Sequence, residues 1–83
     1  MSKYSALRDL LRRSGGATVS ITLKDLAEAV PGGLPSSAYR HRTWWSNEAI
    51  EGRHVQCHEG WAAADYAVVS IDLTKQTVTF RHN

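Results

Sequence analysis

The stretch TLKDLAEAVPGGLPSSAYR, at residues 22–40, decides the fold that we expect for this chain. Thr22 is followed three residues later by Asp25, which is the spacing of a capping box at the start of a helix. Apolar side chains then recur at helical spacing and form one stripe, at Leu23, Leu26, Ala27 and Val30. The sequence therefore predicts a helix that begins at Thr22 and buries this stripe.

A tight turn and a second helix follow this stripe. Pro31-Gly32-Gly33 ends the first helix, because the residue before a proline avoids helical backbone and glycine accepts a sharp turn. After Pro35, either Ser36 or Ser37 can cap the next helix, which carries a basic and aromatic sequence up to Trp44-Trp45. Two adjacent large rings cannot both face one core in regular structure, so we expect one inside and one at the surface. Two helices joined by a short glycine turn indicate a helix-turn-helix.

The flanking segments complete an α+β pattern. Residues 4–13 and 53–64 have apolar side chains at helical spacing, and residues 17–21 are rich in strand-forming types. Apolar and polar residues alternate over residues 66–80 around a short turn, which predicts a C-terminal antiparallel β-hairpin with one buried face. This order is winged-helix-like, with one extra helix before the hairpin. We expect a single domain over residues 1–83.

Length, composition and charge limit the classes of function. The 83 residues are 42% hydrophobic and 22% charged, which leaves room for one modest core and one binding face. No apolar run approaches the roughly 18 residues that cross a bilayer, and the N-terminus lacks an apolar signal core, so we expect a cytoplasmic protein without a membrane partner. The single cysteine fits a reducing compartment. The net charge is only +2, but arginine outnumbers lysine and clusters along the chain.

The basic and aromatic residues 36–47 are the main candidate site. Helix N-termini attract phosphate, arginine pairs with phosphate or guanine, and asparagine pairs with adenine. We therefore predict a small DNA-binding regulator or accessory protein, with Arg12 and Arg13 adding phosphate contacts and a dimer or partner completing the site. The residues expected to contact double-stranded DNA are Ser36, Ser37, Tyr39, Arg40, Arg42, Trp45, Asn47, Arg53 and Lys75.

The C-terminal strand has two interpretations. It can be part of a wing whose Lys75, Arg81 or His82 contacts phosphates. Alternatively, it is an edge strand that its charges protect. That edge could also pair with a second copy of the chain and form a continuous dimer sheet.

Most of the chain from Thr22 onward resembles a small prokaryotic domain family of unknown function. The residues that carry the resemblance are Leu34-Pro35-Ser36-Ser37-Ala38, Trp44-Trp45-Ser46-Asn47, Val55-Gln56, Trp61, Ala63, Ala64 and the hairpin of residues 68–80. The resemblance implies no established activity, and it implies that the Trp-Trp-Ser-Asn segment is the distinctive site. One departure is Asp65-Tyr66, which stands where the family tends to have Gly-Trp.

A protein-interaction module is the alternative hypothesis, for example an inhibitor or adaptor from a mobile element. Trp44 or Trp45 with the neighbouring arginines would then be the hot spot, because tryptophan, tyrosine and arginine dominate such sites.

Metal binding and catalysis have weaker signals. His54, Cys57 and His58 lie at helical spacing, and His41 could complete a zinc site, but no paired CxxC is present. Cys57 with His58 or His41 could form a nucleophile and a base, yet adjacent helical residues point about 100° apart. No glycine-rich phosphate loop or nucleophile elbow accompanies them. We expect no metal, no cofactor and no enzymatic activity.

Overall fold

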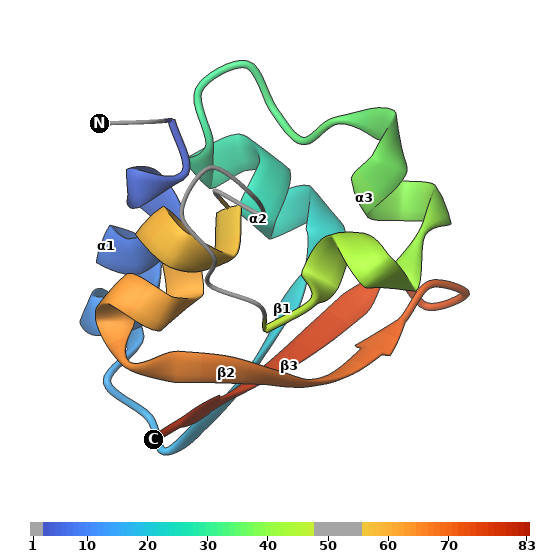
Figure 1. Ribbon diagram of the computed structural model, residues 1–83. Helices are drawn as coiled ribbons and strands as arrows, with labels where there is room; N and C mark the ends of the chain where they lie inside the picture. The colour runs from blue at the N-terminus through green and yellow to red at the C-terminus, as the bar shows by residue number, and fades with distance from the viewer. Residues whose placement is uncertain (1–2, 48–55) are drawn as a thin grey trace.

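The computed structural model, which describes residues 3–47 and 56–83, contains helices along most of the chain, one strand after the first helix and two strands at the end (Figure 1). Their bounds are α1 Ser5–Ser14, β1 Thr18–Thr22, α2 Leu23–Ala29, α3 Ser36–Arg40, η1 Arg42–Trp45, η2 Cys57–Trp61, η3 Ala62–Ala64, β2 Tyr66–Asp72 and β3 Thr77–His82. The helices gather over one face of the sheet (Figure 1). The predicted α+β class is confirmed.

The first half of the predicted helix-turn-helix is confirmed. The Asp25 backbone N–H donates to Thr22 Oγ1 at 3.1 Å, so the threonine caps α2 as its spacing predicts. The helix ends before Val30, and the turn that follows places Gly32 and Gly33 at φ values of +80° and +78°. Residues with a β-carbon rarely adopt these φ values, which explains why glycine occupies both positions of the turn.

The second helix differs from its prediction at both ends. Pro35 occupies the position before α3, and neither Ser36 nor Ser37 caps the helix with its side chain. The helix is only five residues long, because the backbone becomes extended at His41 (φ −123°, ψ 118°). A 3₁₀ turn, η1, follows the break. The break lets the chain fold back, so that the indole Nε1 of Trp45 donates to the carbonyl oxygen of Ala38 at 2.9 Å. The indole thereby satisfies a carbonyl that the short helix leaves free.

The helix expected at residues 53–64 is a composite. Residues 53–55 lie outside the described part of the chain, and the rest forms a π turn, η2, followed by the 3₁₀ turn η3. A β-carbon on Gly60 would lie 3.4 Å from Leu7 Cβ, so the glycine lets η2 lie close against α1. Asp65 ends η3 with φ 63° and ψ 34°. This is left-handed backbone, which explains why the resembling family favours glycine at this step.

The sheet is antiparallel, with strand order β1-β3-β2. The predicted C-terminal hairpin is confirmed, because β2 pairs with β3 from Tyr66 opposite His82 to Asp72 opposite Thr77. The prediction that the last strand is an edge strand is wrong, since β1 pairs with the other side of β3. Local alternation of apolar residues shows which face is buried, but it does not show which strands are neighbours. The edges are β1 and β2, and β2 carries an irregularity between Val68 and Ser70.

The core lies between the sheet and the helices. Leucines of α1 and α2 and two residues of β3 are fully buried, namely Leu7, Leu11, Leu23, Leu26, Val78 and Phe80. Three indoles extend this core toward α3. Trp45 stacks on Trp61 with ring centroids 5.7 Å apart, and Trp44 contacts Trp45 edge to face at 4.6 Å. Trp61 in turn contacts Phe80. The core therefore reaches directly beneath the candidate segment.

Candidate functional site

Four basic or titratable side chains lie together where α3 and η1 meet the β2–β3 turn. Arg40, His41 and Arg42 are exposed on consecutive residues at the break between α3 and η1. The guanidinium of Arg42 donates to the carbonyl oxygen of Ile71 at 3.3 Å, which joins this segment to the end of β2. Lys75, also exposed, follows in the β2–β3 turn. We call Arg40, His41, Arg42 and Lys75 the basic strip.

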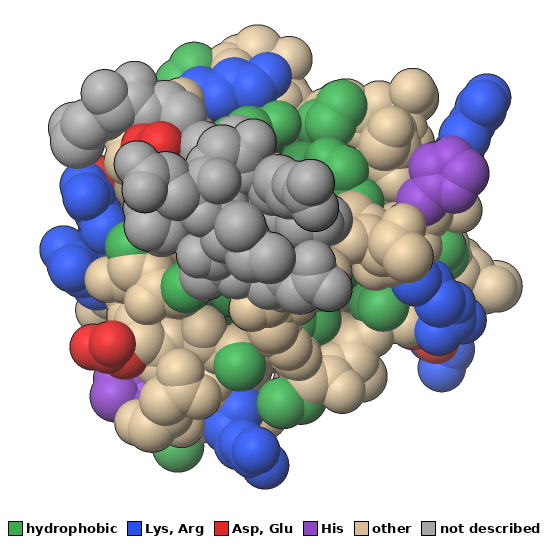
Figure 2. Space-filling model, viewed as in Figure 1, with side chains coloured by type: hydrophobic (Ala, Val, Ile, Leu, Met, Phe, Trp, Pro, Cys, Tyr) green, Lys and Arg blue, Asp and Glu red, His purple; other side chains and the backbone are tan. Residues whose placement is uncertain are grey.

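Within the described part of the chain, no carboxylate side chain is paired with a cation of the strip. Asp72 lies nearby, and its Oδ1 accepts the backbone N–H of Lys75 at 2.9 Å. Lysine, arginine and histidine side chains line the right-hand edge of the molecule, where α3 and the β2–β3 turn lie (Figure 2). The strip is therefore a positively charged surface.

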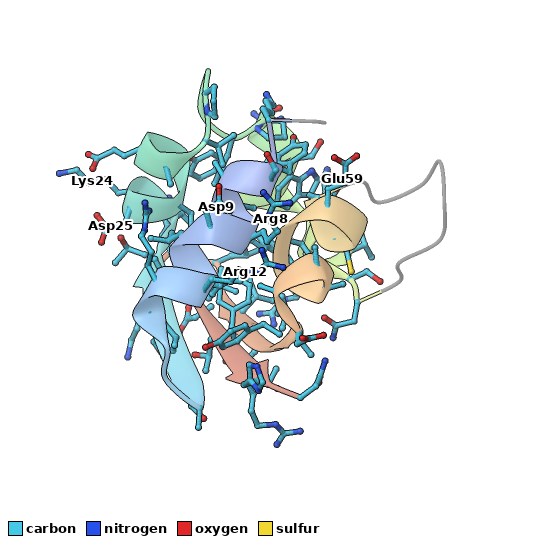
Figure 3. All side chains as sticks on the ribbon, turned by 90° about the vertical axis from the view of Figure 1, so that its left-hand side faces the viewer. Arg8, Asp9, Arg12, Lys24, Asp25 and Glu59 are labelled. Atoms are coloured by element: carbon cyan, nitrogen blue, oxygen red, sulfur yellow. The ribbon has the colours of Figure 1, made fainter. Side chains whose placement is uncertain are left out.

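The opposite side of the molecule carries both signs of charge. Figure 3 shows that side, where Asp9, Asp25 and Glu59 lie among Arg8, Arg12 and Lys24. Arg8 and Asp9 form an ion pair at 3.1 Å. Such a mixture attracts a polyanion less than the basic strip does, because opposite charges at short range cancel each other's field.

The hydroxyl residues of α3 partly keep their predicted place. Ser36 and Ser37 are exposed in its first turn, whereas Tyr39 is half-buried against the core. A helix of one turn offers few side chains to the major groove of DNA. Arg53 lies outside the described residues.

Trp45 cannot be a surface residue, which corrects its predicted role in DNA contact and as an interaction hot spot. Only 2% of it is exposed, and its Nε1–H is already bonded to Ala38. Trp44 is half-buried, with its ring against Tyr4 and Trp61 as well as Trp45. The expectation of one inner and one outer ring therefore holds only in part, since both rings join the same aromatic cluster.

Asn47 is also committed to the fold, which corrects its predicted role as an adenine reader. Its Nδ2 donates to the carbonyl oxygen of Val68, and its Oδ1 accepts the Val68 N–H, both at 2.8 Å. The side-chain amide thus occupies the edge of β2 in place of a neighbouring strand. The N–H and the lone pair that a bidentate contact with adenine would need are therefore already bonded to Val68.

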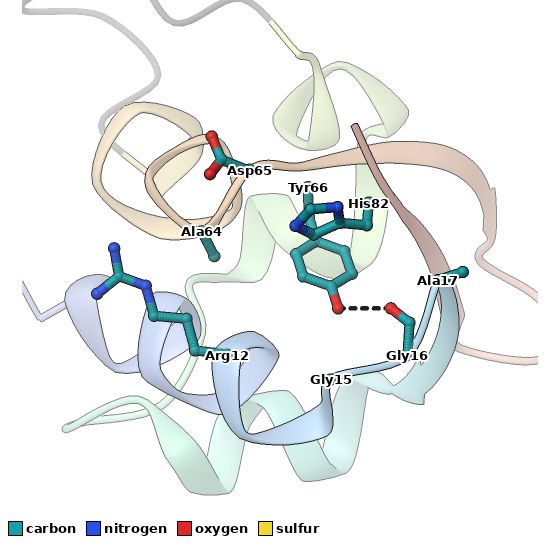
Figure 4. Close-up of a pocket in the computed structure, with 8 residues that line it drawn as sticks. All are labelled: Arg12, Gly15, Gly16, Ala17, Ala64, Asp65, Tyr66 and His82. Carbon is teal, nitrogen blue, oxygen red and sulfur yellow. Dashed lines mark hydrogen bonds between the residues drawn. The ribbon is translucent and has the colours of Figure 1, made fainter.

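A hollow with a volume of about 540 Å³ lies at the other end of the sheet (Figure 4). Arg12, Asp65 and His82 line it from α1, the η3–β2 junction and β3. Tyr66 Oη donates to the carbonyl oxygen of Gly16 at 2.6 Å and closes its floor, and Arg12 donates to the carbonyl oxygen of Ala63 at 3.1 Å. The carboxylate of Asp65 opposes the two basic groups, so this hollow suits a polyanion less well than the strip. Sequence reasoning missed it, because its walls come from distant segments.

Of the residues expected in a metal or nucleophile site, Cys57 is described and buried, whereas His54 and the side chain of His58 lie outside the described part of the chain. Cys57 is 1% exposed, and burial raises the pKa of its thiol, an effect that Trp61 partly opposes. The thiolate that a nucleophile or zinc ligand requires is thus disfavoured. No group of three histidine, cysteine or acidic side chains that could hold a metal is found among the described residues, and His54 lies outside them.

The fold and the strip define a small α+β protein with one positively charged surface beside a buried aromatic cluster. The chain belongs to the family described as Domain of unknown function (DUF7662), whose model matches residues 4–83. A family of unknown function is what the tryptophan-centred sequence pattern indicated. No curated protein and no solved structure matches the chain. In the described residues, no helix has the length and apolar character needed to cross a membrane.

Proposed function

We propose that the protein binds double-stranded DNA through the basic strip. The observation that carries the proposal is the exposure of Arg40 and Arg42 at the α3–η1 break, without carboxylate partners among the described residues. Arginine is suited to this task, because its planar guanidinium can donate two hydrogen bonds to one phosphate.

The shape of the strip favours contacts with the phosphate backbone. Arg42 is oriented by its hydrogen bond to Ile71, and Lys75 approaches from the hairpin turn in the position of a wing. The helix α3 is only one turn long, and the exposed Ser36 and Ser37 share that turn with Arg40. We therefore assign most of the affinity to phosphate contacts and little of it to base reading.

We propose that the protein acts as a small regulator or accessory factor that does not bind one DNA sequence much more strongly than others. If Arg40, Arg42 and Lys75 neutralise three phosphates, the logarithm of the binding constant falls with the logarithm of salt concentration with a slope of about −2.7. Raising the salt from 50 to 200 mM would then weaken binding roughly 40-fold.

Fluorescence anisotropy with a labelled duplex tests the proposal. Arg40→Ala should weaken binding and reduce the salt slope by about one, because it removes one phosphate contact. Lys24→Ala is the matched control, since it removes one positive charge from an exposed position of α2, on the side of the molecule that carries both signs of charge (Figure 3). Circular dichroism checks that both variants fold.

Two results would overturn the proposal. One is the absence of binding to any duplex at 50 mM salt or below. The other is equal weakening by Arg40→Ala and Lys24→Ala, which would show that net charge, and not the strip, attracts the DNA.

A further inference from the structure

The two edges of the sheet are protected to different degrees. The outer edge of β2 is occupied by side chains, because the amide of Asn47 bonds both backbone groups of Val68 and Arg42 bonds the carbonyl oxygen of Ile71. The irregularity next to Val68 disturbs the edge further. Side-chain cover and bulges are means by which proteins prevent another strand from pairing.

The outer edge of β1 has none of these protections. On its inner side, His82 N–H donates to the carbonyl oxygen of Ala17, and Leu23 N–H donates to the carbonyl oxygen of Gln76. Because hydrogen-bonded residues alternate along an antiparallel pair, residues 17, 19, 21 and 23 direct their backbone groups toward β3. The N–H and C=O groups of Thr18 and Ser20 therefore point away from the sheet. Among the described residues, no hydrogen bond to these outward groups is present. The strand TVSIT contains no charge, no proline and no register shift.

We infer that two copies of this chain pair through their β1 strands. Antiparallel pairing centred on Ser20 lets each Ser20 exchange backbone hydrogen bonds with its counterpart. The same register brings each Thr22 N–H to the Thr18 carbonyl of the other copy. The two three-stranded sheets then become one continuous sheet.

The strand is complementary to itself. In the paired register Val19 of one copy lies opposite Ile21 of the other, which is a favourable pair of β-branched side chains. Both residues are only half-buried in the single chain, and β1 is the last strand on this side of the sheet among residues 3–47 and 56–83. No like charges meet, because the strand has none. A second copy therefore covers this edge without repulsion within the paired strands.

Sedimentation equilibrium over a range of protein concentrations, without nucleic acid, tests the inference. An edge of five residues makes a small interface, so we expect a weak dimer that forms at high concentration. Ser20→Pro should abolish it, because proline removes the outward N–H and is tolerated on an edge strand. Ser20→Ala is the matched control. It loses the same side-chain bond to Thr79 Oγ1 but keeps the N–H, so it should dimerise like the unchanged chain.

Amide hydrogen exchange gives a second measurement that does not depend on the folding of a variant. In the unchanged chain, exchange at Ser20 and Thr22 should slow as protein concentration rises. A chain that stays monomeric at millimolar concentration would overturn the inference. So would a dimer that Ser20→Pro leaves intact, or concentration-independent exchange at these two amides.

Discussion

Asn47→Ala is the substitution that separates a residue of the fold from a residue of the binding surface. It removes both hydrogen bonds that the side-chain amide makes with Val68. Hydrogen bonds of this kind contribute about 0.5–1.5 kcal/mol each, and water can reach the freed groups at this exposed edge. We therefore expect the free energy of unfolding to fall by about 1–1.5 kcal/mol. For a domain of this size the melting temperature should drop by roughly 4–12 °C.

Urea denaturation followed by tryptophan fluorescence measures this change, and DNA affinity of the folded variant is measured at low temperature. The affinity should stay the same, because the N–H and the lone pair that Asn47 would use in a bidentate contact with adenine are already bonded to Val68. Thr43→Ala, at an exposed position nearby, is a control that should leave stability within about 0.5 kcal/mol. Unchanged stability combined with weaker DNA binding would refute the reasoning, since it would show that Asn47 contacts DNA and does not stabilise the fold.

Asn47→Asp adds a dependence on pH. The carboxylate can still accept the Val68 N–H, but its second oxygen faces the Val68 carbonyl oxygen and repels it. Only the protonated acid can donate to that carbonyl, so folding raises the pKa of the introduced group. The stabilisation is fully present below the unfolded pKa of about 3.9 and is lost as pH rises through the folded pKa. A flat difference from Asn47→Ala between pH 3 and 7 would contradict this geometry.

Two further predictions concern Cys57 and Asp65. Burial raises the pKa of the Cys57 thiol, so this group lowers stability as pH rises above about 8.5; denaturation of Cys57→Ala should show a shallower loss there, and equal pH profiles would contradict the prediction. At Asp65 the backbone is left-handed, so thermal unfolding should rank Asp65→Gly above Asp65→Ala by about 1 kcal/mol. Ala63 lies in helical backbone, so Ala63→Gly should lower the stability by about 1 kcal/mol. If glycine were more stable than alanine at both positions, or less stable at both, the backbone explanation would be wrong.

Elements set by neighbouring residues could be predicted from the sequence. The Thr22 cap depends on a backbone N–H three residues away, and the β2–β3 hairpin depends on a short turn, so the sequence predicts both features correctly. The break at His41 could not be read in this way. It depends on Trp45 reaching back to Ala38 and on packing against Trp61, and the second of these contacts comes from a distant segment. The central position of β3 likewise depends on β1, from the other end of the chain.

The same distinction applies to the site. Arg40 and Arg42 were found because charges cluster locally, and their exposure agrees with the prediction. Trp45 and Asn47 were chosen for chemical types that suit recognition. The fold uses those same groups, an indole N–H and a carboxamide, to satisfy its own backbone at α3 and β2. Residue type shows what a side chain can bond, and only its surroundings show whether that capacity is already used.

The bond from Trp45 to Ala38 has a consequence for how this surface can evolve. Because α3 is a single turn bonded to the buried Trp45, the packing of the aromatic core determines the direction of Arg40. Selection can exchange the exposed charges one by one, and so retune attraction to a ligand, without touching the interior. A change of the buried indole, by contrast, would alter the folding of the core and the direction of Arg40 together.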